Sequence, residues 1–226
     1  MAAVQDRAGE QRAVRVLIAS GNSGKCREIR ALLALSWLTW VEPGELPVRW
    51  IAPAEDAGSF FGNARQKARS GAAQSGLPCL ADDSGLIVPA LGGAPGVYSS
   101  RYAGERATAR DNNRRLLESL AGQEDRRARF ECAVVLVDAG GEIVAETTGR
   151  VTGRITSGPE RGERGFGYDP LFVPDGYSQT FGELGDEVKG RISHRARALA
   201  ALREALERAS AAERLGAIAD GRARQG

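Results

Sequence analysis

Short apolar runs alternate with helical apolar patterns in the first third of the chain. The mostly apolar run Val14 to Ala19 predicts a buried first strand. Between Trp37 and Trp50 we expect a loop and another short strand, and Ser59 is placed to cap a helix from Phe60 to about Ala73. A helix is also expected directly after the first strand, with an apolar face made by Cys26, Ile29, Leu32, Leu33 and Leu35.

The second half predicts an antiparallel part of the sheet. Phe130 to Val137 and Glu142 to Thr148 flank the turn segment 138–141 and form a hairpin, and a further strand is expected around Val151 to Thr156. A helix is expected from Thr108 to Leu120. The last helix has an apolar face made by Ala198, Leu199, Leu202 and Leu206. The whole pattern predicts an α/β fold, a mixed sheet with helices packed against it.

The stretch Leu80-Ala81-Asp82-Asp83-Ser84-Gly85-Leu86 interrupts this apolar pattern with two adjacent carboxylates. Two carboxylates at the end of a buried strand repel each other and lose hydration. They persist most easily where a cation or several hydrogen-bond donors compensate them. The alternative is a plain turn, in which Asp and Ser cap backbone groups and Gly85 supplies a positive φ.

A second polar segment, Ser20-Gly21-Asn22-Ser23-Gly24-Lys25, joins the first predicted strand to the first helix. Free N–H groups and the dipole at a helix start form an anion site, and Lys25 adds positive charge. The segment is not a Walker A loop, because only two residues separate its glycines and Cys26 follows the lysine. Taken alone, it is equally well interpreted as a generic loop.

The other candidate site residues are each ambiguous when taken alone. Asn63 and Lys67 lie four positions apart and share a helix face, which in most helices is solvated. Glu55 alone is typical of a surface acid. In the glycine-rich loop after the acidic stretch, Arg101 or the backbone is expected to approach another segment. Arg126, Arg127 and Arg129 suit a solvated strand flank or a nucleic-acid patch.

Two further segments combine aromatic and polar groups. Gly165 to Phe172 places aromatic residues between glycines, which suits stacking on a flat ring or a tight turn with core aromatics. His194 is the only histidine in the chain, and no local residues supply the partners of a catalytic triad or a zinc site.

Composition limits the classes of partner. The formal net charge of +2 over 226 residues does not indicate a polyanion partner. Cys26, Cys79 and Cys132 are far apart and lack metal-binding spacing, which fits a reducing cytoplasm. No segment has the length of a membrane helix, and residues 1–12 lack the apolar core of a signal peptide. We expect a cytoplasmic protein that binds neither membrane nor nucleic acid.

Five segments together carry a resemblance. They are Ser20-Gly-Asn-Ser-Gly-Lys25, Phe60-Phe-Gly-Asn-Ala-Arg-Gln-Lys67, Ala81-Asp-Asp-Ser-Gly-Leu86 with Gly92-Gly-Ala-Pro-Gly96, Gly165-Phe-Gly-Tyr-Asp-Pro170 and Ser193-His-Arg195. In kind and order they resemble the inosine triphosphate pyrophosphatase family, from Val14 to about Leu206. We therefore expect residues 1–13 to be an N-terminal extension, 14–208 the nucleotide pyrophosphatase domain, and 209–226 a frayed or disordered C-terminal tail.

The resemblance implies a fold and a reaction. The fold is a long, mixed, twisted sheet with flanking helices that form two lobes around an active-site cleft. The reaction is attack of water on the α-phosphorus of ITP, dITP or XTP, which releases the nucleoside monophosphate and pyrophosphate. It also implies a requirement for Mg²⁺ and a homodimer.

The resemblance assigns roles to residues at the phosphate end. Asp83 would bind metal and orient or deprotonate the attacking water, with Glu55 as a second acidic ligand and Asp82 in support. Lys25 would be catalytic and would hold the triphosphate. The further phosphate-binding candidates are Ser20, Gly21, Asn22, Ser23, Gly24, Lys67, Lys189 and Asn63.

The remaining assignments concern the base. Phe166 would stack on the purine, and His194 and Arg195 would donate toward its 6-oxo group, where adenine carries an amino group instead. The other substrate-binding candidates are Ser84, Gly167, Tyr168 and Asp169. Two alternatives stay open: a Maf-like pyrimidine nucleotide pyrophosphatase, and a non-catalytic nucleotide or nucleic-acid binding module.

Overall fold

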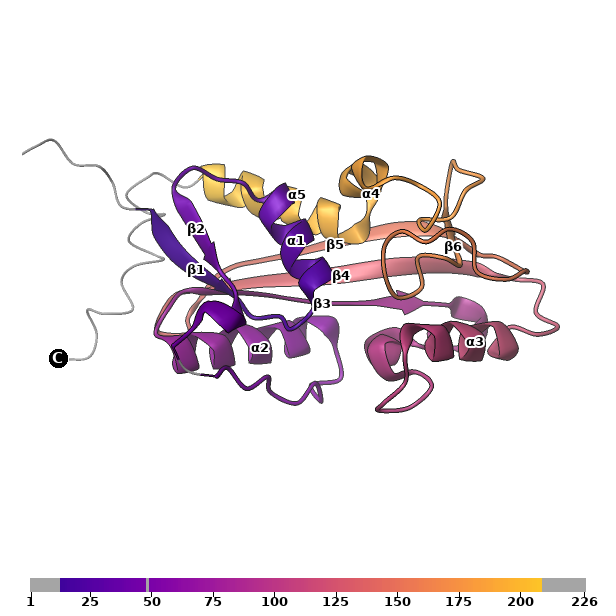
Figure 1. The fold of residues 1–226 in the computed structure, drawn as a ribbon, viewed down its shortest axis with the longest axis horizontal. Coiled ribbons are helices and arrows are strands. Elements are labelled where there is room, and N and C mark those ends of the chain that lie inside the picture. The colour runs from indigo at the N-terminus through magenta and orange to yellow at the C-terminus, as the bar shows by residue number, and fades with distance from the viewer. Residues whose placement is uncertain (1–12, 48, 209–226) are drawn as a thin grey trace, which may run out of the picture.

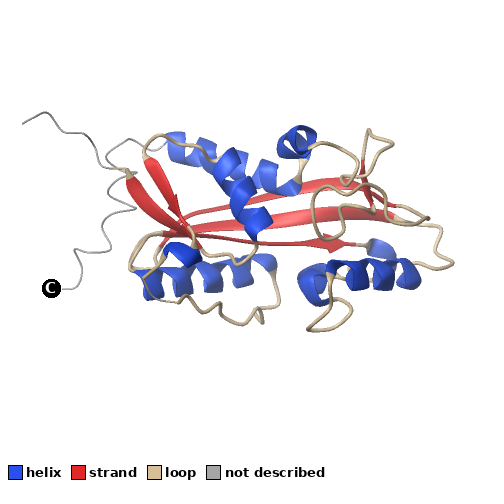
Figure 2. Cartoon of the chain, in the orientation of Figure 1, coloured by secondary structure: helices blue, strands red, loops and turns tan. Residues whose placement is uncertain are grey.

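The computed structural model describes residues 13–47 and 49–208, and there it has one six-stranded sheet with helices on both sides (Figures 1 and 2). The strands are β1 (Val14–Ile18), β2 (Leu38–Val41), β3 (Cys79–Ile87), β4 (Arg127–Val137), β5 (Ile143–Ile155) and β6 (Phe172–Pro174). Their order is β2-β1-β3-β4-β5-β6. β1 is parallel to β2 and β3, and the other pairs are antiparallel. The predicted mixed sheet with flanking helices is confirmed.

The helices cover different parts of this sheet. They are α1 (Ser23–Leu32), α2 (Phe60–Ser75), α3 (Ala109–Ser119), α4 (Asp186–Ile192) and α5 (His194–Arg208), with short 3-10 helices at Pro43–Glu45, Pro89–Leu91 and Gly96–Arg101. In Figure 1, α1, α4 and α5 lie on one side of the sheet, and α2 lies on the other. Ser59 caps α2 as predicted, because its side chain accepts a hydrogen bond from Gly62 N. Among the described residues, no helix has both the length and the apolar character that a bilayer span requires.

The connections around β1 open a crevice at one edge of the sheet. α1 leads from β1 to β2 on one side, and α2 leads from β2 to β3 on the other. Ligands in α/β sheets bind where consecutive connections leave in opposite directions, outside the carboxyl ends of the strands. β1 pairs with β3 only as far as Ile18 and Leu80, whereas β3 continues to Ile87. From Ala81 to Leu86, that edge of β3 pairs with no strand in the described part of the chain, and at Ile87 it meets Pro95 in an isolated bridge.

Three apolar clusters hold the molecule together. One side of β1, β3 and β4 packs against α1 and α5, and the opposite side packs against α2 through Ala64, Ala68 and Ala72. The third cluster lies at the far end of the long strands and includes Phe130, Phe172 and residues of α3. The crevice lies between the α2 cluster and this far cluster. Residues 1–12 and 209–226 lie outside the described residues, so the predicted extension and tail stay predictions.

The acidic stretch lies in the middle of a strand and not at the end of one. In β3, Asp82 pairs with Val134 and Asp83 with Ala133, and the ladder with β4 continues to Ile87. The turn interpretation is therefore wrong. Gly85 is extended here, and it is needed because a Cβ at this position would lie 2.5 Å from Ser99 Oγ.

β5 corrects a second expectation. The two strands predicted over Glu142 to Thr148 and Val151 to Thr156 form one strand, although the hairpin with β4 is confirmed. Gly149 lies between the two predicted strands, and the structure uses it for close packing. A Cβ on Gly149 would collide with the α5 backbone at His194 and Ala198. Here the glycine permits a helix to approach the sheet.

The arginines that precede and begin β4 have partners within the protein. Arg126 donates to the carbonyl oxygens of Leu120, Ile155 and Thr156. Arg127 pairs with Asp125, and Arg129 pairs with Glu131. These contacts agree with the interpretation as a strand flank.

Candidate active site

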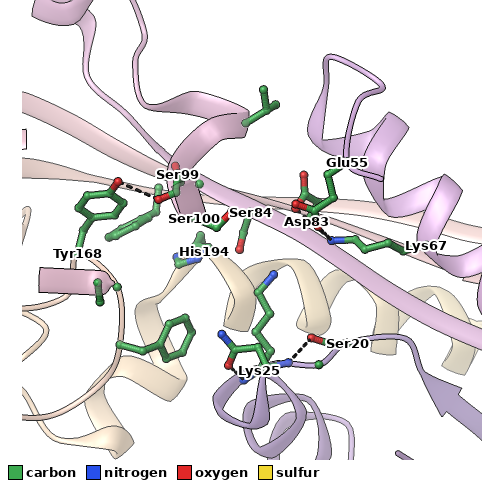
Figure 3. Close-up of a pocket in the computed structure, with 18 of the residues that line it drawn as sticks. Ser20, Lys25, Glu55, Lys67, Asp83, Ser84, Ser99, Ser100, Tyr168 and His194 are labelled. Carbon is green, nitrogen blue, oxygen red and sulfur yellow. Dashed lines mark hydrogen bonds and ion pairs between the residues drawn. The ribbon is translucent and has the colours of Figure 1, made fainter. Parts of the chain in front are cut away.

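A cavity of about 470 Å³ occupies the crevice beside β3 (Figure 3). Most residues predicted for the site line it, although they come from segments far apart in the chain. They are Ser20, Gly21, Asn22, Lys25, Glu55, Lys67, Asp83, Ser84, Phe166, Gly167, Tyr168, Asp169, Lys189 and His194. Ser23, Gly24 and Arg195 are not part of the lining. The acidic cluster and the Tyr168–Ser99 pair lie on opposite sides of this space in Figure 3.

Side chains of the loop after β1 fix the conformation of that loop. Asn22 Oδ1 accepts a hydrogen bond from Lys25 N at 3.1 Å, and Ser20 Oγ accepts one from Asn22 N at 3.2 Å. Gly24 allows close approach, because a Cβ there would lie 3.1 Å from the Phe166 ring. Lys25 extends from α1 into the cavity (Figure 3). The loop therefore presents backbone and one ammonium to the cavity, as an anion site requires.

Asp83 is held by two residues of α2. Asn63 Nδ2 donates to Asp83 Oδ2 at 2.9 Å, and Lys67 Nζ lies 3.2 Å from Asp83 Oδ1. The predicted shared face of Asn63 and Lys67 is confirmed, but this face is buried and not solvated. Burial raises the pKa of Asp83, and the charges of Lys67 and Lys25 offset this only in part. Asp83 is therefore a carboxylate whose charge the protein compensates incompletely.

Asp82 points to the opposite face of β3, because adjacent strand residues alternate. Its Oδ2 accepts hydrogen bonds from Arg195 Nε and Nη2 at 3.1 and 2.9 Å, and it lies 3.2 Å from Lys25 Nζ. Burial would raise the pKa of Asp82, but the charges of Lys25, Arg195 and Lys67 outweigh burial and hold it far below its usual range. This carboxylate stays ionised and orients the basic residues around it.

Glu55 lies on residues 49–58, which we call the strap. Its Oε1 lies 2.7 Å from Lys67 Nζ, and Arg101 Nη2 donates to its backbone oxygen at 2.8 Å. The Arg101 guanidinium is also 3.6 Å from Glu55 Oε2, so the predicted approach of Arg101 to another segment is confirmed. Burial would raise the pKa of Glu55, but Lys67, Lys25 and Arg101 lower it below the usual value.

The two acids suit a hydrated metal ion. Within residues 13–47 and 49–208, no three His, Cys, Asp or Glu side chains form a metal-binding group. Asp83 and Glu55 nevertheless converge on one ammonium, Lys67 Nζ, at 3.2 and 2.7 Å. Mg²⁺ keeps several waters and binds through one or two carboxylates together with substrate phosphates. The donor set at this point fits that mode of binding.

At the other end of the cavity, Phe166 is fixed by Asp169. Asp169 Oδ2 accepts hydrogen bonds from Phe166 N at 2.8 Å and from Lys189 Nζ at 2.7 Å. Lys189 Nζ also lies 4.3 Å from the centre of the Phe166 ring. Burial raises the pKa of Asp169 and is only partly offset by Lys189. Tyr168 closes this side, because its hydroxyl donates to Ser99 O at 2.9 Å.

His194 is a neutral ring in the cavity wall. It stacks on Phe130, with ring centres 4.8 Å apart and planes 15° apart. Burial and the charges of Arg195 and Lys189 hold the pKa of His194 well below its usual value. Its Nδ1 is buried and has no hydrogen-bond partner in the described part of the chain. The ring can therefore exchange hydrogen bonds with a ligand without carrying charge.

Arg195 lies behind the wall of the cavity. Its side chain is 1% exposed and donates to Asp82 and to Ser84 Oγ, and it also pairs with Glu28. Glu28 is a residue that the sequence reasoning missed. Its second oxygen lies 2.9 Å from Lys189 Nζ, so one carboxylate joins the two basic residues. The available signal was its spacing from Lys25, three positions along the same helix face.

Comparison with known proteins finds chains that are similar over most of this sequence. Residues 16–205 match the model of the Ham1 family. A dITP/XTP pyrophosphatase of Deinococcus deserti is 49% identical over 192 residues, 84% of this chain and 88% of that protein. One from Rhodospirillum centenum is 47% identical over 184 residues, 80% of this chain and 89% of that protein. A HAM1 protein from Coxiella burnetii has a similar structure, with a TM-score of 0.79 at 39% identity, and the match covers 87% of this chain and 100% of that one.

Proposed function

This chain belongs to the Ham1 family, and we propose from its cavity that it hydrolyses non-standard purine nucleoside triphosphates, namely ITP, dITP and XTP, to the monophosphate and pyrophosphate. The observation that carries the proposal is one cavity with an anion loop, an undercompensated carboxylate and an aromatic wall. These are the parts that phosphate, attacking water and a flat base require. The enzyme is thus a nucleoside triphosphate pyrophosphohydrolase that removes such nucleotides from the pool.

The reaction breaks the bond between the α-phosphorus and the bridging oxygen to the β-phosphorus. A water oxygen forms the new bond to the α-phosphorus, and pyrophosphate leaves with the bridging oxygen. Asp83, whose pKa is raised by burial, orients this water and accepts its proton. Lys25, Lys67 and the Ser20 to Gly24 amides stabilise the charge on the phosphoryl oxygens.

Asp83 and Glu55 would hold the magnesium ion, which supplies charge neutralisation on the phosphates when bound. The support for this assignment is their convergence on Lys67 Nζ, which a cation can replace or accompany. Asn63 and Arg101 keep the two carboxylates in place from α2 and from the Gly96–Arg101 turn.

The base would lie between Phe166 and the wall formed by Tyr168 and His194. Lys189 and the buried Arg195 bring N–H donors to this end of the cavity, and Ser84 joins Arg195 to the lining. Such surroundings favour the oxygen at position 6 of hypoxanthine and xanthine over the amino group of adenine. Arg195 acts on the base directly only if its ion pair with Asp82 rearranges.

We further propose a homodimer in the cytoplasm, as the family resemblance implies. The three cysteines agree with a reducing compartment, because Cys26, Cys79 and Cys132 are all free and buried.

Product analysis tests the function. The protein is incubated with dITP, dGTP and dTTP, each with and without Mg²⁺, and pyrophosphate is separated from orthophosphate. We expect magnesium-dependent pyrophosphate and dIMP, with much slower use of dGTP and dTTP. Orthophosphate and dIDP would overturn attack at the α-phosphorus, and preferred use of dTTP would favour the Maf-like alternative.

A further inference from the structure

The strap differs from its surroundings in how it is held. In the described part of the chain, residues 49–58 make no backbone-to-backbone hydrogen bond. Side chains hold them instead: Gln74 bonds both the N–H and the C=O of Ile51 at 2.9 Å, and Asn63 Oδ1 accepts from Ala57 N at 3.0 Å. Arg101 provides the contact to Glu55 O described above. The strap can therefore adjust over a ligand without breaking a backbone ladder.

Trp50 brings a large side chain from the strap into the cavity wall. The indole packs against the α2 cluster and also lines the cavity. Its Nε1 is buried and donates to no acceptor within the described residues. A buried N–H without a partner costs free energy comparable to a lost hydrogen bond, so a movement of the strap that brings this N–H to an acceptor on a ligand is favoured.

The position of Trp50 identifies which part of a ligand it meets. The cavity runs from the far cluster, where Phe130 and Tyr168 lie, to the α2 cluster, where Trp50 lies. Lys67 belongs to the same face of α2 as Ala64 and Ala68, which are in the cluster that Trp50 covers. Trp50 is therefore at the end with the carboxylates and ammonium groups, and opposite the aromatic wall.

We propose that Trp50 closes the phosphate end of the cavity and donates its indole N–H to the pyrophosphate portion of the substrate. The proposal rests on the proposed function for the direction of the nucleotide. A phosphate oxygen is a charged acceptor, and hydrogen bonds to charged acceptors are stronger than those between neutral groups. Trp50 thus adds an indole N–H donor for the phosphate chain of the substrate, a group that none of the polar motifs contains.

Direct binding of the two product halves tests the proposal. Isothermal titration calorimetry, at one fixed magnesium concentration, compares pyrophosphate and dIMP binding to the wild type and to Trp50→Phe, which keeps an aromatic wall and removes the N–H. We expect pyrophosphate affinity to fall roughly tenfold or more in the variant, because a hydrogen bond to a charged group is lost. Affinity for dIMP should stay within twofold of the wild type.

Trp40→Phe is the matched control, because Trp40 Nε1 donates to Leu33 O at 3.0 Å outside the cavity. It should change neither affinity. The proposal is overturned if Trp50→Phe binds pyrophosphate as the wild type does, if both affinities fall equally, or if the wild type binds no pyrophosphate. Failure of the proposed function is a separate result, since dITP hydrolysis is measured independently of these titrations.

Discussion

Asp82 and Asp83 are neighbours in the chain, but the two faces of β3 surround them with different partners and shift their pKa values in opposite directions. On the Asp82 face, Arg195 and Lys25 approach one carboxylate, and its pKa falls despite complete burial. On the Asp83 face, Asn63 and Lys67 approach a carboxylate whose pKa remains raised. The side-chain alternation of one strand thus separates a carboxylate that organises the structure from one that is available for chemistry.

Burial alone does not identify the reactive acid of the two. Both side chains are at least nine-tenths buried, and both have an ammonium within 3.2 Å. The difference is the guanidinium of Arg195, which donates twice to Asp82 Oδ2 but does not reach Asp83 in any described contact. Perturbed acids in a cavity are functional candidates, and the direction of the shift separates the two roles here.

Asp83→Asn should have the largest effect. We expect kcat for dITP to fall about 10³-fold, because the amide cannot accept the proton of the attacking water. The free energy of unfolding should not decrease, since burial already disfavours the ionised form. Steady-state kinetics and urea unfolding measure the two quantities. Near-normal turnover would remove Asp83 from its assigned role.

Asp82→Asn should lower the stability of the protein more than its turnover, the reverse of what we expect for Asp83→Asn. Neutralising Asp82 leaves the Arg195 guanidinium, whose side chain is 1% exposed, with Glu28 as its remaining carboxylate. We therefore expect a loss of about 3 kcal/mol in the free energy of unfolding, the low end for breaking a buried ion pair. Turnover per folded molecule should fall less than in Asp83→Asn. A loss below about 1 kcal/mol in urea unfolding would show that Asp82 is not the structural member of the pair.

Arg101→Lys tests the Asp83 face indirectly, through the position of Glu55. Lysine cannot bond the backbone and the carboxylate of Glu55 together, so Glu55 should be held less firmly. We expect kcat/KM at limiting Mg²⁺ to fall about tenfold, the equivalent of one charge-assisted hydrogen bond. High Mg²⁺ should restore most of the activity. A loss that magnesium does not change would place Arg101 outside the metal site.

On the Asp82 face, His194 should make stability depend on pH, an effect smaller than those of the three substitutions above. His194 titrates below its usual pKa in the folded protein because of burial and the neighbouring Arg195. The unfolded chain therefore binds the proton first, and stability falls as pH decreases below 6.5.

From pH 6.5 to 5.5 we expect a loss of about 1 kcal/mol in the free energy of unfolding. His194→Phe keeps a ring against Phe130 and should abolish this slope in urea unfolding at several pH values. An equal slope in the variant would assign the pH dependence to carboxylates.

Features that depend on neighbours in the chain could be predicted from the sequence. The Ser59 cap, the common face of Asn63 and Lys67, and the first strand followed by a polar loop are all local. The burial of that common face could not be predicted, because it depends on β3 lying against α2. Periodicity defines which residues share a face, but it does not say what covers the face.

Long-range partners account for most of what the sequence reasoning missed. Arg195 and Asp82 are 113 positions apart, and Glu28 meets Arg195 over 167 positions. Nothing in the spacing of either residue reports such a contact. The need for glycine at position 149 has the same origin, since the α5 backbone that requires it, at His194 and Ala198, lies far along the chain. In each case tertiary packing, and not local preference, decided the structure.

The contact between Asp82 and α5 has a consequence for how the chain is made. Synthesis proceeds from the N-terminus, so β3 leaves the ribosome more than a hundred residues before Arg195 does. Until then the Asp82 carboxylate has no guanidinium, and removing its water would be unfavourable. The nascent sheet must therefore keep this position hydrated. Water leaves the core beneath α5 only when α5, the last described helix, docks, so both events form one late step of folding.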